Sequence, residues 1–285
     1  MQPFDLVNRL ERVKALDPIA APIQKFVRTF VRPQWLRDVL HGVPIGHPAH
    51  PMLVQGTIGA LMSSAVLDRV PGAELGADTL LQAGIVSAVP SVAAGLVDFS
   101  EQNPQHSRVG VVHAAANTTA LAFFISSLVA RRRGNRDLGR RLALYGLGGL
   151  SVGGLLGGHI SFHSSGGASH AADVFDRASR DWQPVCEFND LPDGKPVRQM
   201  LGDLPLFVLR DGNGAYAIFD VCSHLGGPLS DGELIGSGSD RCIVCPWHGS
   251  TFRIVNGHVV HGPATAPQPA FDVRVRDGQL EARLR

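Results

Sequence analysis

Two short cysteine–histidine pairs constrain this chain more than any other feature of its sequence. Cys222 and His224 have C-x-H spacing, and Cys245 and His248 have C-x-x-H spacing. Glycine and proline flank both pairs, so each pair should lie in a tight turn whose backbone amides face inward. Two such loops can hold one small metal centre from opposite sides. Two thiolates suit one iron of a binuclear iron–sulfur centre, and two imidazoles suit the other.

Zinc is the main chemical alternative, because two cysteines and two histidines also suit a closed tetrahedral site. Zinc fingers usually pair cysteine with cysteine and histidine with histidine, whereas both pairs here are mixed. The compound pattern Cys-Ser-His-Leu-Gly and Cys-Pro-Trp-His-Gly-Ser resembles the Rieske [2Fe–2S] family. The resemblance implies that Cys222 and Cys245 bind the inner iron, and that His224 and His248 bind the outer, redox-active iron.

Neighbouring residues resemble the ferredoxin and oxygenase branch of that family. Higher-potential members carry two further cysteines, joined in a disulfide, where this chain has Gly227 and Trp247. Ser250 is either a donor to a cluster sulfide, which would raise the reduction potential, or a polar turn residue. Pro263 lies in a Gly-Pro-Ala-Thr stretch that resembles the loop covering the cluster. We expect a low to intermediate potential.

Short alternating runs predict a small all-β domain over residues 182–285. Six strands are expected, over 197–201, 206–210, 216–220, 251–255, 271–276 and 280–284. Asn256-Gly and Asp277-Gly are hairpin-turn signals. The remaining cysteines, Cys186 and Cys242, are expected to be small strand residues rather than a disulfide.

Four apolar runs between residues 47 and 165 contain no Asp, Glu, Lys or Arg. They cover 52–67, 80–97, 109–130 and 142–162. About 20 apolar residues cross a bilayer as a helix, and abundant glycine lets such helices pack closely. A soluble bundle of four buried helices is the alternative, but helices of that kind usually show a polar face. We therefore predict a four-helix transmembrane bundle.

The same segment resembles the DUF2231 family of membrane proteins, over roughly residues 40–165. The resemblance rests on three stretches: His47-Pro-Ala-His50-Pro, His113-Ala-Ala-Ala-Asn117 and the Gly-Gly-His159 that ends the fourth run. It implies a small four-helix membrane unit and no particular activity.

Histidines are concentrated in this segment, and ionisable groups inside a membrane are costly and usually functional. Four alternating helices bring the starts of the first and third runs to the same side as the end of the fourth. We therefore expect His50, His113 and His159 to converge, with His163 on the same helix face as His159. These four histidines are candidate ligands for haem b or for copper or zinc. A quinone hydrogen bond or simple interhelical hydrogen bonds are the alternatives.

The predicted organisation is α + β in separate domains. Basic residues 1–46 should form amphipathic helices, broken at Asp17-Pro18, that lie on a membrane surface or against the next domain. The four-helix bundle should cover 47–165, and a linker with a flexible Gly/Ser part should cover 166–181. The Rieske domain should cover 182–285.

This organisation favours a membrane-anchored one-electron carrier over a complete enzyme. The net charge of +1 gives no footprint for nucleic acid. The carrier would contact membrane lipid and exchange electrons with a partner protein, a quinone or a haem in the bundle. A subunit of a membrane redox enzyme and a redox-sensing regulatory protein are the alternatives.

Two features bear on orientation in the membrane, which we expect to be a bacterial inner membrane. The arginines between the third and fourth runs would place that loop in the cytoplasm and the Rieske domain outside. A folded cluster protein facing outside needs a twin-arginine export signal, and none is visible in the sequence. We expect a cytoplasmic Rieske domain.

Overall fold

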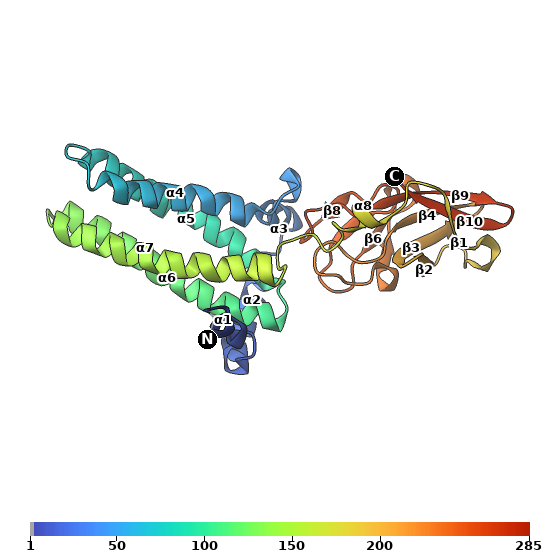
Figure 1. Ribbon diagram of the computed structural model, residues 1–285, viewed down its shortest axis with the longest axis horizontal. Helices are drawn as coiled ribbons and strands as arrows, with labels where there is room; N and C mark the ends of the chain where they lie inside the picture. The colour runs from blue at the N-terminus through green and yellow to red at the C-terminus, as the bar shows by residue number, and fades with distance from the viewer. Residues whose placement is uncertain (1–2) are drawn as a thin grey trace. The chain divides into compact units, whose positions relative to one another are not determined.

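The computed structural model describes residues 3–285, which form two compact units (Figure 1). The first contains the chain up to Leu36 together with Pro48–Gly167. The second contains Arg37–His47 together with Ala168–Arg285. The end of the expected 1–46 segment therefore packs with the second unit, and the first two residues of that segment lie outside the described residues.

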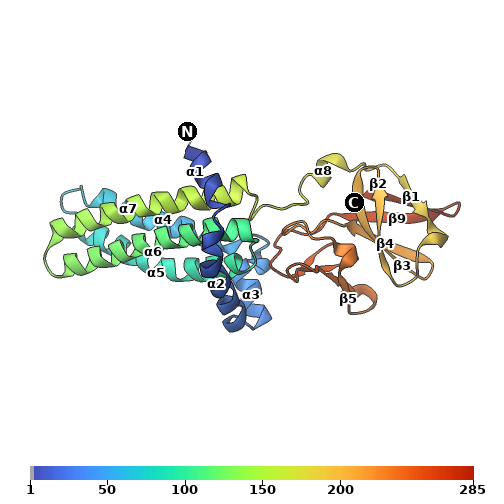
Figure 2. The same cartoon turned by 90° about the horizontal axis from the view of Figure 1, so that it is seen from below.

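Four long helices form most of the first unit as two antiparallel hairpins (Figures 1 and 2). α4 (Ala49–Leu67) packs along α5 (Glu74–Ser100), and α6 (Pro104–Arg132) packs along α7 (Arg136–Gly158). A π-helical turn, His159–His163, follows α7. Contact within each hairpin is far more extensive than contact between hairpins.

The membrane prediction for these four helices holds only in part. α4, α5 and α6 each contain one apolar run, and the fourth run continues from α7 into the π-helical turn, so the helical architecture agrees with the sequence. Among the described residues, however, only α5 and α6 are both long and apolar enough to cross a membrane. A bundle that crosses the membrane four times is therefore not confirmed.

The predicted amphipathic helices are present as α1 (Pro3–Leu10) and α2 (Asp17–Phe30), and Figure 2 shows them lying across the long helices. Arg108 of α6 donates to both carboxylate oxygens of Asp17, over 2.6 and 2.9 Å. α2 therefore packs against its own unit. It also leaves four large apolar side chains exposed, Ile19, Ile23, Phe26 and Phe30.

Buried ion pairs fasten the ends of the hairpins where α4 joins α5 and α6 joins α7. Arg131 donates to Asp68 and to Asp78, each over 2.9 Å, and Arg136 donates to Asp78 over 3.0 Å. The arginines around this loop, which the positive-inside rule would place in the cytoplasm, therefore also hold the two hairpins together.

The second unit contains two antiparallel sheets. The larger has the order β1-β10-β9-β4-β3-β2, and the smaller has the order β5-β6-β7-β8. The strands are β1 (Gln183–Glu187), β2 (Pro196–Leu201), β3 (Leu204–Asp211), β4 (Gly214–Phe219), β5 (Glu233–Ile235), β6 (Cys242–Val244), β7 (Thr251–Arg253), β8 (Val259–His261), β9 (Ala270–Arg276) and β10 (Gln279–Leu284). The all-β prediction is confirmed, and the six predicted strands correspond to β2, β3, β4, β7, β9 and β10.

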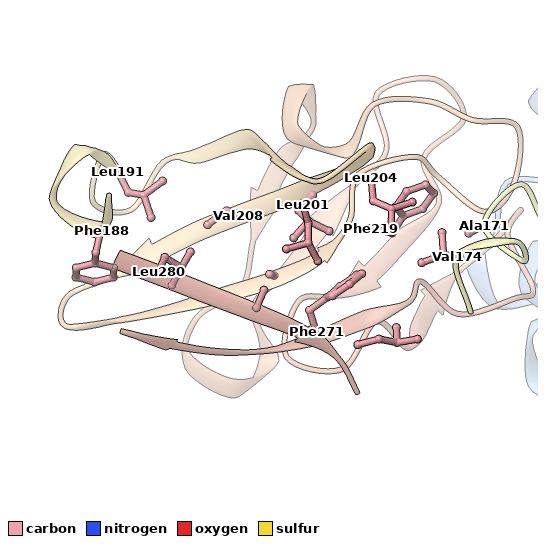
Figure 3. Close-up of a cluster of buried hydrophobic side chains, with 14 residues drawn as sticks. Ala171, Val174, Phe188, Leu191, Leu201, Leu204, Val208, Phe219, Phe271 and Leu280 are labelled. Atoms are coloured by element: carbon pink, nitrogen blue, oxygen red, sulfur yellow. The ribbon is translucent and has the colours of Figure 1, made fainter. Parts of the chain in front are cut away.

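Two apolar cores stabilise this unit. Figure 3 shows the first, which extends from Phe188 and Leu280 at one end to Phe219 and Val174 at the other. Val174 belongs to the short helix α8 (Val174–Arg177) and is fully buried. The expected linker is therefore folded onto the sheet from about this helix onward. The second core packs directly beneath the cysteine–histidine loops, and it includes Phe207, Ile218, Ile243 and Phe252 together with Cys222 and Cys245.

Candidate metal centre

The two cysteine–histidine loops leave neighbouring sheets and each closes on itself. The first follows β4, and the amide of Cys222 donates to Gly227 over 2.8 Å. The second joins β6 to β7, and the amide of Cys245 donates to Ser250 over 2.8 Å. Both cysteines are buried, at 1% and 3% exposure, and neither forms a disulfide. These closed turns fix the cysteines at the surface of the second core.

The four predicted ligands come together at one end of the β unit. The rings of His224 and His248 lie 5.1 Å apart between centroids and are nearly perpendicular, at 89°. The thiol of Cys222 hydrogen-bonds to the sulfur of Cys245. The Nδ1 atom of His224 is buried and makes no hydrogen bond within the described residues. Such an orphaned nitrogen is expected where a metal completes the site.

Space around the cysteines is tight. A Cβ added at Gly227 would lie only 2.9 Å from the Cys245 sulfur. The backbone amides of His224 and Leu225 act to lower the pKa of Cys222, and those of Trp247 and His248 act to lower the pKa of Cys245. Amide donors of this kind stabilise negative charge on a metal-bound thiolate.

The same contacts set the protonation of the four side chains. The hydrogen bond from Cys222 lowers the pKa of Cys245 to about 7, and the amides of Trp247 and His248 add to the effect. That hydrogen bond, together with burial, raises the pKa of Cys222. Burial, followed by repulsion from His248 and His41, lowers the pKa of His224 to about 3. A neutral imidazole and a readily ionised thiol are the forms that bind metal.

These residues fit a binuclear iron–sulfur cluster better than a zinc ion. Structural zinc sites usually take two cysteines from one turn and two histidines from another, whereas each loop here provides one cysteine and one histidine. Two cysteines and two histidines are the ligand set of a binuclear cluster in which each kind of side chain binds its own iron. Cys222 and Cys245 would hold one iron, and His224 and His248 the other. Bound there, the cluster supplies one-electron oxidation and reduction.

Ser250 fastens the loop that contains Pro263. Its side chain is fully buried, and its Oγ accepts a 3.0 Å hydrogen bond from the amide of Ala264. Pro263 is buried beside it. Because Oγ acts as an acceptor toward Ala264, its own hydrogen is available for donation. Donation to a cluster sulfide remains a prediction.

Replacing Ser250 by alanine should lower both the stability and the reduction potential of the centre. The amide of Ala264 would lose a buried acceptor, which costs about 1–3 kcal/mol. Loss of a donor to sulfur would make reduction less favourable. A potentiometric titration followed by electron paramagnetic resonance measures the potential. Ser250→Thr, which keeps the hydroxyl, is the matched control, and an unchanged potential in Ser250→Ala would leave Ser250 as a turn residue only.

A further part of the site, not predicted from the sequence, lies in α3 (Gln34–His41). Asp38 accepts hydrogen bonds from His261 Nδ1 and from the amide of Gly262, both over 2.9 Å. His41, on the next turn, is 2% exposed, and a Cβ added at Gly262 would lie 3.3 Å from its ring. α3 therefore holds the start of the Pro263 loop. Asp38 and His41 are separated from this loop by more than 200 residues, so local pattern alone could not connect them.

A buried glutamine fixes the first cysteine–histidine loop. Gln268 donates to the carbonyls of Phe219 and Val221, and its own carbonyl accepts from the amide of Ser223, all over 2.9 Å. Its near-complete burial was not evident from the sequence. All three bonds fall on either side of Cys222 and therefore orient that ligand.

The membrane histidines form two pairs rather than one cluster. His50 and His113 approach to 6.4 Å between ring centroids. His159 instead lies 3.0 Å from Glu11 and stacks on His163, with ring centroids 4.5 Å apart. The expected meeting of His50 and His113 is therefore observed. The expected participation of His159 is not, because Glu11 from the N-terminal segment provides its partner.

Two known families match different parts of the chain. Residues 181–272 match the model of the Rieske [2Fe-2S] domain, and residues 46–170 match that of a predicted membrane protein, DUF2231. The chain belongs to the Rieske [2Fe–2S] family. In this member a DUF2231 domain precedes the Rieske domain.

Several relatives that match the Rieske domain are ferredoxins. It is 36% identical to ferredoxin CarAc of Metapseudomonas resinovorans over 35% of this chain and 90% of that protein. It is 30% identical to the ferredoxin subunit of anthranilate 1,2-dioxygenase of Burkholderia cepacia, over 36% of this chain and 93% of that protein. A solved ferredoxin of carbazole 1,9a-dioxygenase from Nocardioides aromaticivorans IC177 is 28% identical, over 36% of this chain and 98% of that one, with a TM-score of 0.34.

Proposed function

We propose that this protein is a membrane-anchored one-electron carrier whose Rieske cluster exchanges electrons with a partner protein. The observation that carries the proposal is the meeting of two buried cysteines and two histidines in closed loops, with a buried nitrogen of His224 lacking a hydrogen-bond partner among the described residues. The ferredoxin relatives support the same role, because one of them is the ferredoxin subunit of anthranilate 1,2-dioxygenase. Oxygenase or reductase proteins are thus the partner class we propose.

Membrane anchoring is supported by two features of the helical unit. α5 and α6 have the length and composition of membrane spans, and α2 exposes Phe26 and Phe30 with their rings 4.3 Å apart. Lys25 and Arg28 lie on the same helix, and a basic amphipathic helix of this kind binds lipid surfaces. We propose that all four long helices lie in a bacterial inner membrane. A cytoplasmic Rieske domain would there have access to nicotinamide-dependent reductases.

The helical unit is proposed to hold a second electron carrier, either a haem b or a quinone. Intramembrane histidines usually have a task, and His50 and His113 lie close together. Electrons would then pass between this centre and the Rieske cluster. The chain could in that way serve as a subunit of a larger redox enzyme.

Trp247 is proposed as a contact for the partner protein. It is 57% exposed, and its ring lies 6.4 Å from that of His248. Exposed tryptophans are frequent binding hot spots. Trp247→Ala should therefore slow electron transfer from a flavoprotein reductase about tenfold, the equivalent of about 1.4 kcal/mol.

The rate is measured by stopped-flow absorbance with the reductase of an aromatic dioxygenase system and NADH. Trp182, which packs under Arg274 and Arg283 on the β unit, provides a tryptophan control in Trp182→Ala. An equal slowing in both variants, or a changed cluster spectrum in Trp247→Ala, would contradict a docking role.

The carrier function itself is tested on the full chain purified in detergent. Reduction by dithionite should produce the electron paramagnetic resonance signal of a Rieske cluster, and redox titration should show a reversible one-electron couple. Washed membranes should retain the protein at high salt. A purified chain that contains no iron and sulfide would overturn the proposed electron-carrier function. A chain that high salt releases from membranes would overturn the proposed membrane anchoring.

A further inference from the structure

The two helical hairpins hold a histidine in the same way. In the first hairpin, Nδ1 of His50 lies 2.8 Å from the carbonyl of Ser91. In the second, Nδ1 of His113 lies 2.8 Å from the carbonyl of Gly153. Each ring donates through Nδ1, so its lone pair lies on Nε2. A histidine that ligates a metal usually donates its other nitrogen in this way.

A glycine one helical turn beyond each carbonyl makes room for the ring. A Cβ added at Gly95 would lie 2.8 Å from the Cε1 and Nδ1 atoms of His50. A Cβ added at Gly157 would lie 3.0 Å from Cε1 of His113. The two glycines therefore occupy equivalent places, four residues after Ser91 and Gly153.

The equivalence extends along both hairpins. Ser64 donates to the carbonyl of Ala77 over 2.7 Å, and Ser127 donates to that of Gly139 over 2.6 Å. Equivalent positions are 63 residues apart between α4 and α6, and 62 residues apart between α5 and α7. α5 contacts α6 and α4 contacts α7, as expected for two copies related by an approximate two-fold axis. The helical unit is therefore a duplicated hairpin.

The duplicated histidines meet between the two hairpins. Their rings are 6.4 Å apart between centroids and inclined at 82°. A metal midway would lie about 3.2 Å from each centroid, which matches a bond of about 2.0–2.1 Å plus the radius of an imidazole ring. The amide nitrogen of Asn117 lies 3.1 Å from Nε2 of His113, and an incoming metal would displace it.

We propose that His50 and His113 are the two axial ligands of a haem iron held between the duplicated hairpins. A bare zinc or copper ion would need further protein ligands, and no third His, Cys, Asp or Glu among the described residues completes such a group. Haem iron receives four nitrogens from its macrocycle and needs only two from the protein. This assignment deepens the relay that we propose above, and it narrows the second carrier to haem.

The test is the pyridine haemochromogen assay on full chain produced with added δ-aminolaevulinate and purified in detergent. We expect haem equimolar with the chain and sharp reduced-minus-oxidised bands. His50→Ala and His113→Ala should each lose these bands, whereas His47→Ala, at an exposed histidine, should retain them. His113→Met, which offers a sulfur ligand instead, should shift the bands and raise the haem potential.

A glycine pair provides a control for folding. Gly157→Val would push against His113 and should lose haem, whereas Gly154→Val, at a position with open space, should not. The Rieske signal of each variant is measured in parallel, so loss of the cluster and loss of haem are separate results. Absence of haem after titration with haemin overturns the proposal, and so does haem retained in the His50→Ala/His113→Ala double variant. The proposal is also overturned if the parent chain contains stoichiometric copper or zinc and both histidine variants lose it. The histidines would then bind a bare ion rather than haem.

Discussion

Cys245→Ser should abolish the Rieske signal of the full chain, whereas Cys242→Ser should leave it. Both cysteines are buried, at 3% and 5% exposure, and they lie three residues apart at and just beyond β6. Only Cys245 hydrogen-bonds to Cys222, and only Cys245 has its pKa lowered, to about 7. The thiol of Cys242 instead donates to the carbonyl of Asp240 over 3.3 Å, and Cys242 begins strand β6 rather than lying in the loop that follows it. The first replacement therefore removes a proposed iron ligand, and the second removes only a small strand residue.

The experiment compares iron and sulfide content, visible absorption and electron paramagnetic resonance of the two variants with those of the parent chain. We expect complete loss of the cluster for Cys245→Ser and less than a twofold change for Cys242→Ser. His224→Ala should match Cys245→Ser, since the buried Nδ1 of His224 has no other partner among the described residues. A Cys245→Ser chain that retained its cluster would refute the ligand assignment. Zinc in place of iron in the parent chain would refute the assignment of the centre as an iron–sulfur cluster.

The four proposed ligands could be predicted from the sequence because each pair is local. A tight turn brings Cys222 beside His224, and another brings Cys245 beside His248, whatever the rest of the chain does. Strands such as β9 and β10 were predictable for the same reason, since the Asp277-Gly turn fixes their pairing. Asp277 and Gly278 adopt the positive φ angles, 51° and 87°, of such a turn.

Contacts between distant parts of the chain could not be predicted from local pattern. Asp38 lies in a segment whose basic, amphipathic character indicated either a membrane surface or packing on the helical domain, and neither alternative predicts its bond to Gly262. His159 was expected to join His50, yet it bonds to Glu11. β5, β6 and β8 are three residues long and carry too little alternation to be recognised. The duplication could not be predicted from the sequence because the two hairpins share few identical residues, whereas they share the same pattern of contacts.

Replacing Asp38 by alanine should destabilise the Rieske unit by about 1–3 kcal/mol, because one buried donor and one partly exposed donor would lose their acceptor at once. These donors are Nδ1 of His261 and the amide of Gly262, which begins the loop around Pro263. Asp38 itself is 9% exposed, so water cannot readily replace it. A loosened loop should also admit solvent to the cluster and speed its bleaching in air.

The measurement is the loss of visible cluster absorbance, followed against temperature and against time in air-saturated buffer. Asp38→Asn keeps an oxygen acceptor for the amide of Gly262 but removes the charge facing His261, so it should lie between the parent and Asp38→Ala. Asp181→Ala, at an exposed position of the same unit, is the surface control. Equal melting of all four proteins would show that α3 does not stabilise the loop. If Asp38 holds the Pro263 loop in place, its removal can only speed loss of the cluster. A cluster that is more stable in Asp38→Ala than in the parent would therefore contradict the prediction and would mean that α3 strains the site.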